Sequence, residues 1–422
     1  MIHPSEDIIG TKGNELENKK IIMCITGSVA AVKSPEIARE LMRHGAQIFV
    51  VMSKMAQRII HPDLFEWATG NPVVTELTGK IEHVALCKEA DTVLVAPATA
   101  NTISKIACGI DDTPVTSLVS VAFGAGVPIH IVPAMHESMY RHPILTAHIE
   151  KLQNLGCEFI GPVIVEGKAK IAPVEKIVES VIIKFIKKDM DGMMVLVTAG
   201  PTLEHIDPIR VITNRSSGKM GIAIGQKAYQ RGAEVTLIYG PGIEKPPAYL
   251  NVKNVKTTEQ MHKIVMAELI SNKYDIVFAA AACADFTPVE SSNHKIPTNN
   301  IAELILPLKP TAKIINDVKR VSPNTFLVAF KAEYNRSVEE LVEIAFKRLE
   351  LSKSDIIVVN DVAKPDSGFQ IDTNEVLIID SNKNILHIPL AKKSLIATKI
   401  LDFVMAKLKP TPLDNLVDIK GL

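Results

Sequence analysis

The first half of the chain alternates between apolar runs and stretches with a helical rhythm. Residues 20–53 contain an apolar run that ends at Thr26, a Gly27-Ser28 turn, a helix-like stretch as far as His44, and a second apolar run. Short apolar runs without polar alternation are typical of strands that are buried on both faces of a parallel sheet. Similar runs follow at residues 92–97 and 128–134, separated by helix-length segments. The pattern predicts a doubly wound α/β domain.

The same rhythm starts again after a polar interruption. Residues 186–192 (IKKDMDG) break the pattern, and a fresh apolar run follows at residues 194–200. Helix-like and strand-like segments then alternate, and residues 391–408 are predicted to form a closing helix. A polar stretch between two complete α/β patterns is typical of a domain boundary. The expected parts are an N-terminal extension (residues 1–18), a first domain (residues 19–188) and a second domain (residues 192–422).

Composition fits two packed domains and argues against several other classes of protein. The chain has 422 residues, of which 47% are hydrophobic and 22% are charged, so it is too long for one ordinary core. Lysine plus arginine and aspartate plus glutamate each total 47, which leaves no net positive charge to attract nucleic acid. The five cysteines are scattered without a CxxC pair, and no apolar run reaches the roughly 20 residues that span a bilayer. We therefore expect a cytoplasmic protein without nucleic-acid or membrane partners.

In the first half, candidate chemistry stands where predicted strands end. The Gly27-Ser28 turn leads into a helix start, so its free N–H groups suit a phosphate, although plain helix capping explains the turn equally well. A lone histidine such as His83 is more often structural than catalytic. His136, Glu137 and His142 miss the spacing of the HExxH pattern, which argues against a zinc site.

In the second half, a polar run at residues 213–219 (TNRSSGK) precedes a predicted helix. It is not a Walker-type phosphate loop, because Lys219 is followed by Met220 and no glycine stands five residues before Gly218. Its donors and its lysine nevertheless suit an anionic ligand. Charged residues near later strands either bind a ligand at the sheet edge or remain solvated surface charges. These residues are Asp285, Lys295, Lys347 and Lys353.

Longer strings of residues carry a family resemblance. In the first half they are ITGSVAAVKS, EHVALCKEADTVLVAPATANTISKIACG and PAMHESMY. In the second half they are TAGPTLEHIDPIRVITNRSSGKMG, AAAACADFTP, HKI, VAFKAE and IIVVNDV. From about residue 19 to residue 407 the chain resembles the bifunctional phosphopantothenoylcysteine decarboxylase / phosphopantothenate-cysteine ligase family of coenzyme A biosynthesis, in its archaeal type. The ligase strings are the closer match.

For the first half, the resemblance implies a flavodoxin-like decarboxylase domain that uses FMN as an electron sink. His83 falls on the family's active histidine. The family's PAMN motif reads PAMH here, so His136 replaces a substrate-binding asparagine. The flap at residues 165–171 lacks the proton-donating cysteine of bacterial members, which leaves Lys168, Lys170, His136 or a water as the acid. The implied FMN-binding residues are Gly27, Ser28, Ser53, Ala98, Thr99 and Asn101.

For the second half, the resemblance implies a Rossmann-like ligase that joins 4′-phosphopantothenate to cysteine. CTP and Mg²⁺ (or Mn²⁺) would convert the carboxylate to an acyl-cytidylate, from which the cysteine amine displaces CMP, and the sequence leaves both CTP and ATP open. Asn214 falls on the residue that polarises this intermediate. The implied nucleotide contacts are Ala279, Ala280, Ala281, Asp285, Lys295 and Phe330, with Lys347 and Lys353 as a less close match. The family forms homo-oligomers from ligase dimers and decarboxylase trimers, a dodecamer among them.

Two other functions remain open for the first half. The changes at His136 and in the flap fit a flavin-binding regulatory or assembly module that has lost catalysis. A Gly-Ser turn like that at Gly27 also occurs in flavin prenyltransferases, which share a similar fold. The fused ligase-like half argues against a prenyltransferase.

Overall fold

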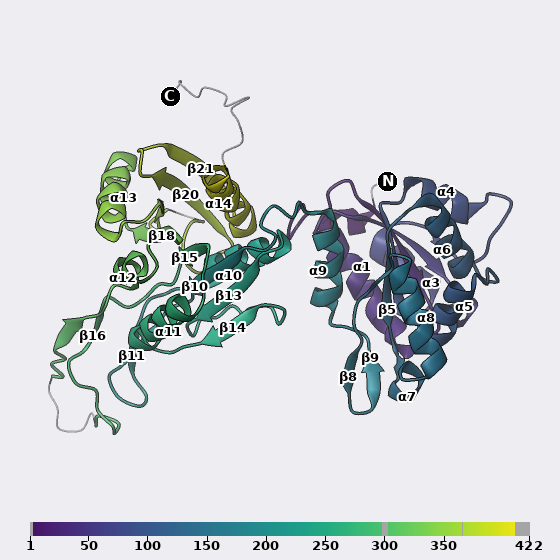
Figure 1. The fold of residues 1–422 in the computed structure, drawn as a ribbon, viewed down its shortest axis with the longest axis horizontal. Coiled ribbons are helices and arrows are strands. Elements are labelled where there is room, and N and C mark those ends of the chain that lie inside the picture. Colours follow the sequence, from purple (N-terminus) through teal and green to yellow (C-terminus); the bar gives the residue numbers. More distant parts are fainter. Residues whose placement is uncertain (1–2, 298–302, 365, 410–422) are drawn as a thin grey trace. The chain divides into compact units, whose positions relative to one another are not determined.

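The computed structural model describes residues 3–297, 303–364 and 366–409 (Figure 1). The chain divides into two compact units, Met1–Ile186 and Lys187–Leu422, and each has its own sheet and its own hydrophobic core. Residues 3–18 lie within the expected extension, and one of them, Leu16, is fully buried in the core of the first unit. A short 3₁₀ helix, η1 (Pro4–Ile8), precedes it.

The first unit is built on a six-stranded parallel sheet in the order β3-β2-β1-β4-β5-β7. Apart from the two-residue edge strand β3, this is the strand order of flavodoxin, so the predicted flavodoxin-like class is confirmed. In β1, Ile21 and Met23 pack into one helix layer, whereas Ile22 and Cys24 pack into the other. The strands are β1 (Lys20–Ile25), β2 (Gln47–Met52), β3 (Val73–Val74), β4 (Thr92–Ala98), β5 (Ile129–Pro133) and β7 (Glu158–Phe159).

Helices cover both faces of this sheet (Figure 1). Buried side chains of α1, α3 and α9 join the core on one face, and those of α4, α5, α6 and α8 join the core on the other. The helices are η2 (Val29–Lys33), α1 (Ser34–Arg43), α2 (Lys54–Gln57), α3 (Pro62–Thr69), α4 (Glu82–Glu89), α5 (Ala100–Cys108), α6 (Pro114–Ala125), α7 (Glu137–Tyr140), α8 (Pro143–Asn154) and α9 (Val174–Phe185). A small antiparallel sheet forms the flap from β6 (Met135–His136), β8 (Val163–Val165) and β9 (Lys168–Lys170).

The second unit is built on an eight-stranded sheet in the order β14-β13-β10-β15-β18-β19-β20-β21. Its first six members are parallel and follow the 3-2-1-4-5-6 order of dinucleotide-binding sheets, which confirms the predicted Rossmann-like class. β20 and β21 extend the sheet as antiparallel strands. The strands are β10 (Met194–Ala199), β13 (Glu234–Tyr239), β14 (Asn251–Asn254), β15 (Ile276–Ala279), β18 (Phe326–Glu333), β19 (Ile356–Asp361), β20 (Thr373–Asp380) and β21 (Ile385–Lys392).

Helices also cover both faces of the second sheet. α10 (Lys219–Gln230) and α14 (Lys393–Leu408) share one core, and α11 (Thr258–Ser271), α12 (Ile314–Val321) and α13 (Val338–Ser352) lie over the other face. The predicted closing helix begins at Lys393 and not at Ala391, because Ala391 and Lys392 still pair with β20. Two short hairpins were not predicted, and they are β11 (Leu203–His205) with β12 (Val211–Thr213) and β16 (Phe286–Pro288) with β17 (Leu308–Pro310).

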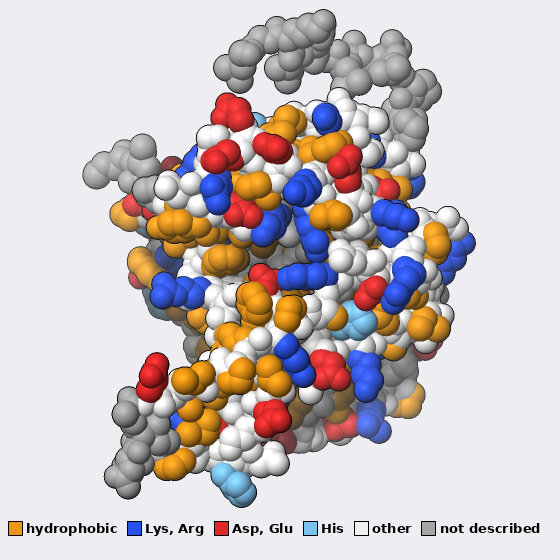
Figure 2. Space-filling view, turned by 90° about the vertical axis from the view of Figure 1, so that its left-hand side faces the viewer, with side chains coloured by type: hydrophobic (Ala, Val, Ile, Leu, Met, Phe, Trp, Pro, Cys, Tyr) orange, Lys and Arg blue, Asp and Glu red, His pale blue; other side chains and the backbone are white. Residues whose placement is uncertain are grey.

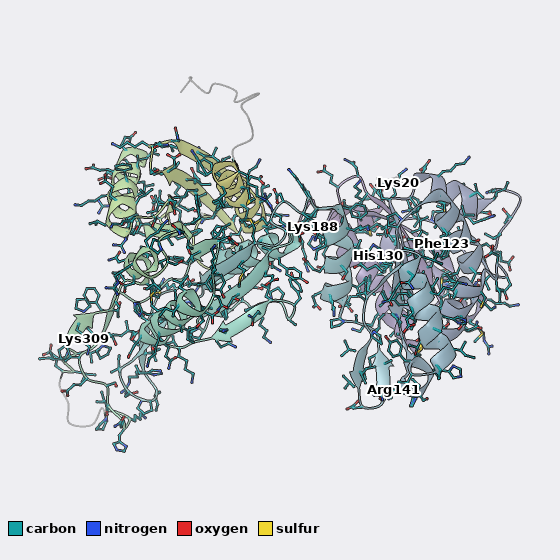
Figure 3. All side chains as sticks on the ribbon, in the orientation of Figure 1. Lys20, Phe123, His130, Arg141, Lys188 and Lys309 are labelled. Carbon is teal, nitrogen blue, oxygen red and sulfur yellow. The ribbon has the colours of Figure 1, made fainter. Side chains whose placement is uncertain are left out.

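His130 is a buried histidine in β5 of the first unit (Figure 3). Its side chain is 1% exposed, and neither ring nitrogen has a hydrogen-bond partner among the described residues. The Nδ1 atom lies 3.4 Å from Glu158 Oε2 without forming a hydrogen bond. Burial, followed by the positive charge of Lys184, lowers the pKa of His130 to about 4. His130 is therefore neutral in the folded protein at neutral pH.

We predict that the first unit loses stability as the pH falls from about 6.5 to about 4. The unfolded chain binds a proton at His130 below pH 6.5, whereas the folded chain does not until about pH 4, so acid costs about 3 kcal/mol of stability. Trp67, the single tryptophan of the chain, lies in this unit, and its fluorescence in urea titrations reports unfolding. A His130→Phe variant should lack this part of the pH dependence. An identical pH profile in that variant would contradict the prediction.

Candidate functional site

The main cleft of the second unit lies at the carboxyl ends of its parallel strands. It encloses about 980 Å³ and lies at the ends of the adjacent parallel strands β10 and β15, where the strand order reverses. Ligands of open α/β sheets bind at such switch points. Lys and Arg side chains gather around the hollow on the face shown in Figure 2. The segments that line the cleft include residues 214–221, 279–285, 311–315, 330–334 and 367–371.

The polar run before α10 forms one side of this cleft. The twelve-residue helix begins after Gly218, whose φ of +86° strains any other residue and whose added Cβ would lie 2.7 Å from the Tyr239 ring. Gly221 allows α10 to approach β10, because a Cβ at Gly221 would lie 2.4 Å from the Cβ of Ala199. Free N–H groups and the positive end of α10 therefore border the cleft and favour an anion.

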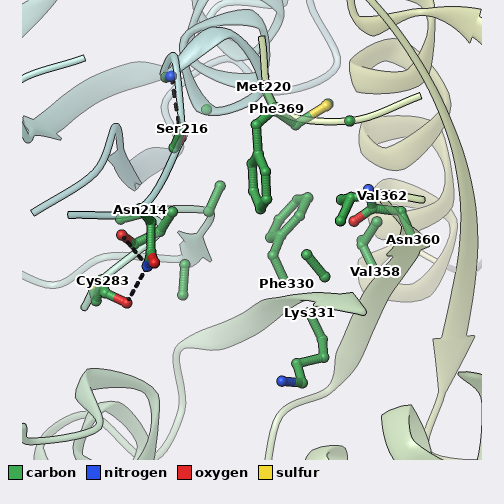
Figure 4. A pocket seen from close by; sticks show the side chains of 18 of the residues that line it. Asn214, Ser216, Met220, Cys283, Phe330, Lys331, Val358, Asn360, Val362 and Phe369 are labelled. Carbon is green, nitrogen blue, oxygen red and sulfur yellow. Dashed lines mark hydrogen bonds between the residues drawn. The ribbon is translucent and has the colours of Figure 1, made fainter. Parts of the chain in front are cut away.

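Asn214 connects this polar run to the end of β15 (Figure 4). Its Nδ2 donates to the carbonyl oxygens of Ala282 at 3.2 Å and Cys283 at 2.9 Å. Both amide hydrogens are thereby engaged, so Asn214 must exchange one of these bonds before it can donate to a ligand. The contact places Asn214 beside Ala279, Ala280 and Ala281, which also line the cleft.

Basic side chains come to the cleft from several elements. Lys313 forms an ion pair with Asp285, and the Thr311 hydroxyl donates to the carbonyl of Ala284 at 2.6 Å, which fixes the start of α12 beside the cleft. Arg348 lines the cleft from α13, where burial lowers its pKa. Lys313 and Arg348 were not predicted from the sequence. Arg348 directly follows the predicted Lys347, so a helical-wheel comparison of the two neighbours was the signal that could have found it.

The structure brings only part of the predicted nucleotide set into this cleft. Asn214, Asp285 and Phe330 line it together with the three alanines after β15. Lys295, Lys347 and Lys353 are not among the described residues that line the cleft, and their part in nucleotide binding remains a prediction. Lys347 borders a separate hollow of about 650 Å³ on the outer side of α13, because it is rotated by about 100° from Arg348. Lys353 is the left-handed residue that ends α13.

Lys295 also lies outside the cleft lining, in a segment that is tied to another loop. The backbone N–H of Ile296 donates to Asp207 Oδ2 at 3.2 Å, and Arg210 Nη1 donates to the carbonyl of Ile296 at 3.1 Å. The Asp207 side chain is fully buried and also accepts from the backbone of Ile209 and from Arg210. The segment with Lys295 is thus held by the loop between β11 and β12.

In the first unit, the predicted FMN residues gather at the carboxyl edge of the sheet. Gly27 and Ser28 follow β1, Ser53 follows β2, and Ala98 ends β4 directly before Thr99 and Asn101. A Cβ at Gly27 would lie 2.5 Å from the Cβ of Met55, so only glycine fits this turn. Hydrogen bonds join the loop after β1 to the loops after β4 and β5. Thr26 Oγ1 donates to the Pro97 carbonyl at 2.7 Å and accepts from the Thr99 N–H at 3.1 Å, and Ser28 Oγ donates to the Ala134 carbonyl at 3.3 Å.

His83 lies in the first turn of α4, the helix that leads into β4. A helix that crosses back to a parallel strand begins at the carboxyl edge of the sheet, so His83 lies toward the same edge as Gly27. Its Nδ1 is buried and has no hydrogen-bond partner within the described part of the chain. An unpaired buried ring nitrogen at this edge is a group that a ligand can satisfy.

His136 is at the N-terminus of α7, next to the flap. Its ring Nδ1 lies 2.9 Å from the Ser138 hydroxyl, and its backbone pairs with Lys168 of β9. Glu166 and Gly167 form the tip of the flap with positive φ values, and Lys170 pairs with Glu166 at 3.1 Å. Two candidate acids, His136 and Lys168, are therefore neighbours across the flap sheet.

No group of three or more His, Cys, Asp or Glu side chains that could hold a metal ion occurs among residues 3–297, 303–364 and 366–409. In the same part of the chain, no helix is long and apolar enough to cross a membrane.

Two family models match the chain, one in each unit. Residues 9–186 match the model described as "Flavoprotein". Residues 190–408 match the model described as "DNA/pantothenate metabolism flavoprotein C-terminal domain". The two matches meet within four residues of the boundary between the structural units. The first unit is therefore a flavoprotein domain.

Known proteins resemble most of the chain. The coenzyme A biosynthesis bifunctional protein CoaBC of Thermococcus kodakarensis is 52% identical over 90% of this chain and 93% of its own length, and that of Methanocaldococcus jannaschii is 40% identical over 90% and 92%. A solved C-terminal domain of a CoaBC protein is 30% identical, covering 53% of this chain and 100% of that chain with a TM-score of 0.44. The family predicted from the motifs is thus confirmed. The chain belongs to the CoaBC family of bifunctional coenzyme A biosynthesis enzymes, which combine phosphopantothenoylcysteine decarboxylase and phosphopantothenate-cysteine ligase.

Proposed function

We propose that the second unit ligates 4′-phosphopantothenate to cysteine with CTP, and that the first unit uses FMN to decarboxylate the product to 4′-phosphopantetheine. The observation that carries the ligase assignment is the cleft at the switch point of the second sheet, where a helix start, an amide and several cations converge. Triphosphates need that combination of backbone donors and positive charge. We propose CTP and not ATP as the nucleotide because of the family resemblance.

In the ligase reaction, the carboxylate attacks the α-phosphorus of CTP and pyrophosphate leaves. The cysteine amine then attacks the acyl carbon, loses a proton, and CMP departs with the bonding electron pair. The start of α10 and Lys219 would bind the phosphates. Asn214 would release one carbonyl and donate to the charge that develops on the intermediate, and Arg348 would neutralise that charge.

Mg²⁺ (or Mn²⁺) fits this scheme as an ion that enters with the nucleotide. Magnesium is usually bound by one or two carboxylates together with substrate phosphates, and does not need a dedicated cage of protein ligands. Asp285 is a carboxylate in the cleft, and it is paired with Lys313. We propose that Asp285 contributes to that binding.

In the first unit, the residues at the sheet edge fit FMN. The Gly27-Ser28 turn and Ser53 would hold the phosphate, and residues 98–101 would contact the ring. FMN supplies the temporary acceptor for two electrons when it is bound. His83, whose buried Nδ1 has no partner in the described chain, would orient the substrate carboxylate. His136 or Lys168 would return the proton after CO₂ leaves.

Homo-oligomers also form part of the proposal, with ligase dimers, decarboxylase trimers and a dodecamer as their combination. Exposed apolar side chains support such contacts in both units. Val29, Val32 and Met55 are exposed beside the phosphate turn, and Phe286 and Leu308 are exposed on the β16–β17 hairpin.

The five free cysteines fit a reducing cytoplasm.

One assay tests both halves of the proposal. The purified chain is incubated with FMN, 4′-phosphopantothenate, cysteine and either CTP or ATP, and the products are identified by mass spectrometry. We expect CMP, pyrophosphate, CO₂ and 4′-phosphopantetheine with CTP. Accumulation of phosphopantothenoylcysteine without CO₂ would support the ligase activity and refute the decarboxylase activity. The first unit would then be a regulatory flavin-binding module. A chain that consumes no nucleotide would refute the ligase scheme.

We predict that His83→Asn lowers the decarboxylase kcat about 100-fold or more, because the shorter amide no longer orients the substrate carboxylate as the imidazole ring would. FMN absorbance and ligase activity should remain, since the substitution leaves the phosphate turn and the second unit intact. The control is His142→Asn, an exposed histidine at the N-cap of α8 in the same unit. Equal decarboxylation by His83→Asn and the wild type would remove His83 from the reaction.

We predict that Arg348→Met raises the KM for CTP about tenfold or more, whereas Lys347→Met changes it less than twofold. Arg348 lines the cleft and its neighbour does not, so only the first change removes a charge-assisted contact to the nucleotide. Steady-state ligase kinetics on the two variants measure the difference. A larger effect from Lys347 would show that the nucleotide binds on the outer side of α13.

A further inference from the structure

Lys393 is a buried lysine at the wall of the ligase cleft. It is the first residue of α14, its exposed fraction is 6%, and its side chain is directed at the segment between β19 and β20. The ammonium group donates to the carbonyl oxygens of Gly368 at 2.7 Å, Ile371 at 2.6 Å and Phe369 at 3.3 Å. All three hydrogens of the ammonium group are thus used on one loop. We name residues 367–371 the wall loop.

The wall loop is also held from the opposite side, by the polar run before α10. The Ser217 hydroxyl donates to the Phe369 carbonyl at 2.5 Å, so that oxygen accepts from Ser217 and from Lys393. Lys219 donates to the Gln370 carbonyl at 3.4 Å and pairs with Asp372 at 2.5 Å. The wall loop therefore links α14 to the segment that carries Asn214.

The Phe369 side chain extends from this loop into the cleft toward Phe330 of β18 (Figure 4). Both rings line the cleft, and they come from segments that are about 40 positions apart in the chain. Two aromatic rings in the wall of one cleft favour a planar group, such as a nucleobase, over an aliphatic chain. The orientation of Phe369 is set by its own backbone, whose carbonyl is fixed by Ser217 and Lys393.

The charge of Lys393 is costly at this position. Burial, followed by repulsion from Lys219, lowers the pKa of Lys393 to about 8, and Asp372 only partly opposes this shift. The lysine makes no ion pair among the described residues, and its direct contacts are carbonyl oxygens. Buried lysines without a carboxylate partner are uncommon, and those in clefts are candidates for a role in function.

We propose that Lys393 is a positioning residue of the ligase, which holds the wall loop so that Phe369 and Phe330 form an aromatic slot for the nucleobase. The proposal rests on the nucleotide use proposed above. Lys393 does not touch the reacting atoms in this scheme. It acts through the Phe369 carbonyl and, by way of Ser217, on the loop that carries Asn214.

The first test compares Lys393→Met with Lys393→Arg in the full-length chain. Methionine keeps the length of the side chain without any donor, so the wall loop is released, and the KM for CTP should rise about 10- to 100-fold while the KM for cysteine stays within twofold. Arginine restores donors and charge and should recover most of the loss. Lys399→Met, an exposed lysine on the same helix, is the matched control and should behave as the wild type.

Two internal readouts separate positioning from loss of folding. Decarboxylation of phosphopantothenoylcysteine by the same preparations should not change, because that site lies in the first unit. Phe369→Leu should raise the KM for CTP by itself. The double variant with Lys393→Met should have a KM no higher than that of the more impaired single variant, because both substitutions act through one loop. Circular dichroism melts verify that the second unit is folded.

The outcomes are distinguishable. A wild type that consumes CTP together with a Lys393→Met variant of unchanged KM would overturn the positioning role and leave the proposed function intact. Fully additive effects of Lys393→Met and Phe369→Leu would also overturn it, because Lys393 would then act elsewhere. A wild type that uses no nucleotide would instead defeat the proposed function. If Lys393→Met does not fold, the Ser217→Ala and Phe369→Leu pair tests the same loop from its other support.

Discussion

The close contact between α10 and β10 is the constraint on which the ligase cleft depends. It exists because Gly221 has no side chain at a point where a Cβ would overlap Ala199. The contact places the positive end of the helix and the loop of Asn214 beside the carboxyl end of β15. Any larger residue at Gly221 would move the helix outward, and the donors around the cleft would separate. Packing at one small residue thus sets the geometry of a polar site several residues away.

The two units use the same edge of a parallel sheet in different ways. In the first unit, hydrogen bonds from the hydroxyl groups of Thr26 and Ser28 join three loops near the proposed phosphate site. In the second unit, the loops are joined by charged as well as polar side chains, including Lys219 and Lys393. A phosphate that binds backbone N–H groups needs little further charge, whereas a triphosphate needs cations. Lys219 and Lys393 beside the cleft are in keeping with the proposed use of a triphosphate there.

The sequence predicted the strands correctly where each strand corresponds to one apolar run. The central strands of both sheets are buried on both faces, so their side chains leave an uninterrupted signal that tertiary contacts do not override. Edge elements such as β14 and the β16–β17 hairpin are short and partly exposed, and their pairing is decided by neighbours that are distant in the chain. Asn214 and Phe330 were expected from the family resemblance, and both line the cleft. Lys347 was expected from the family resemblance and Arg348 was not, because a linear motif does not resolve which side of α13 faces the cleft. Lys393 was missed because a lysine at a helix start ordinarily faces solvent, and only the folded wall loop buries it.

The two bonds of Asn214 have a consequence for the design of inhibitors. Its amide already satisfies two neutral carbonyl oxygens, so a competing acceptor gains only the difference between itself and a peptide group. An anionic oxygen accepts a stronger hydrogen bond from Asn214 than a peptide carbonyl does, whereas a ketone, ester or amide oxygen accepts one of about the same strength. For the proposed mixed anhydride, neutral mimics should therefore obtain no affinity from Asn214, and medicinal chemistry at this corner of the cleft would have to retain a formal negative charge.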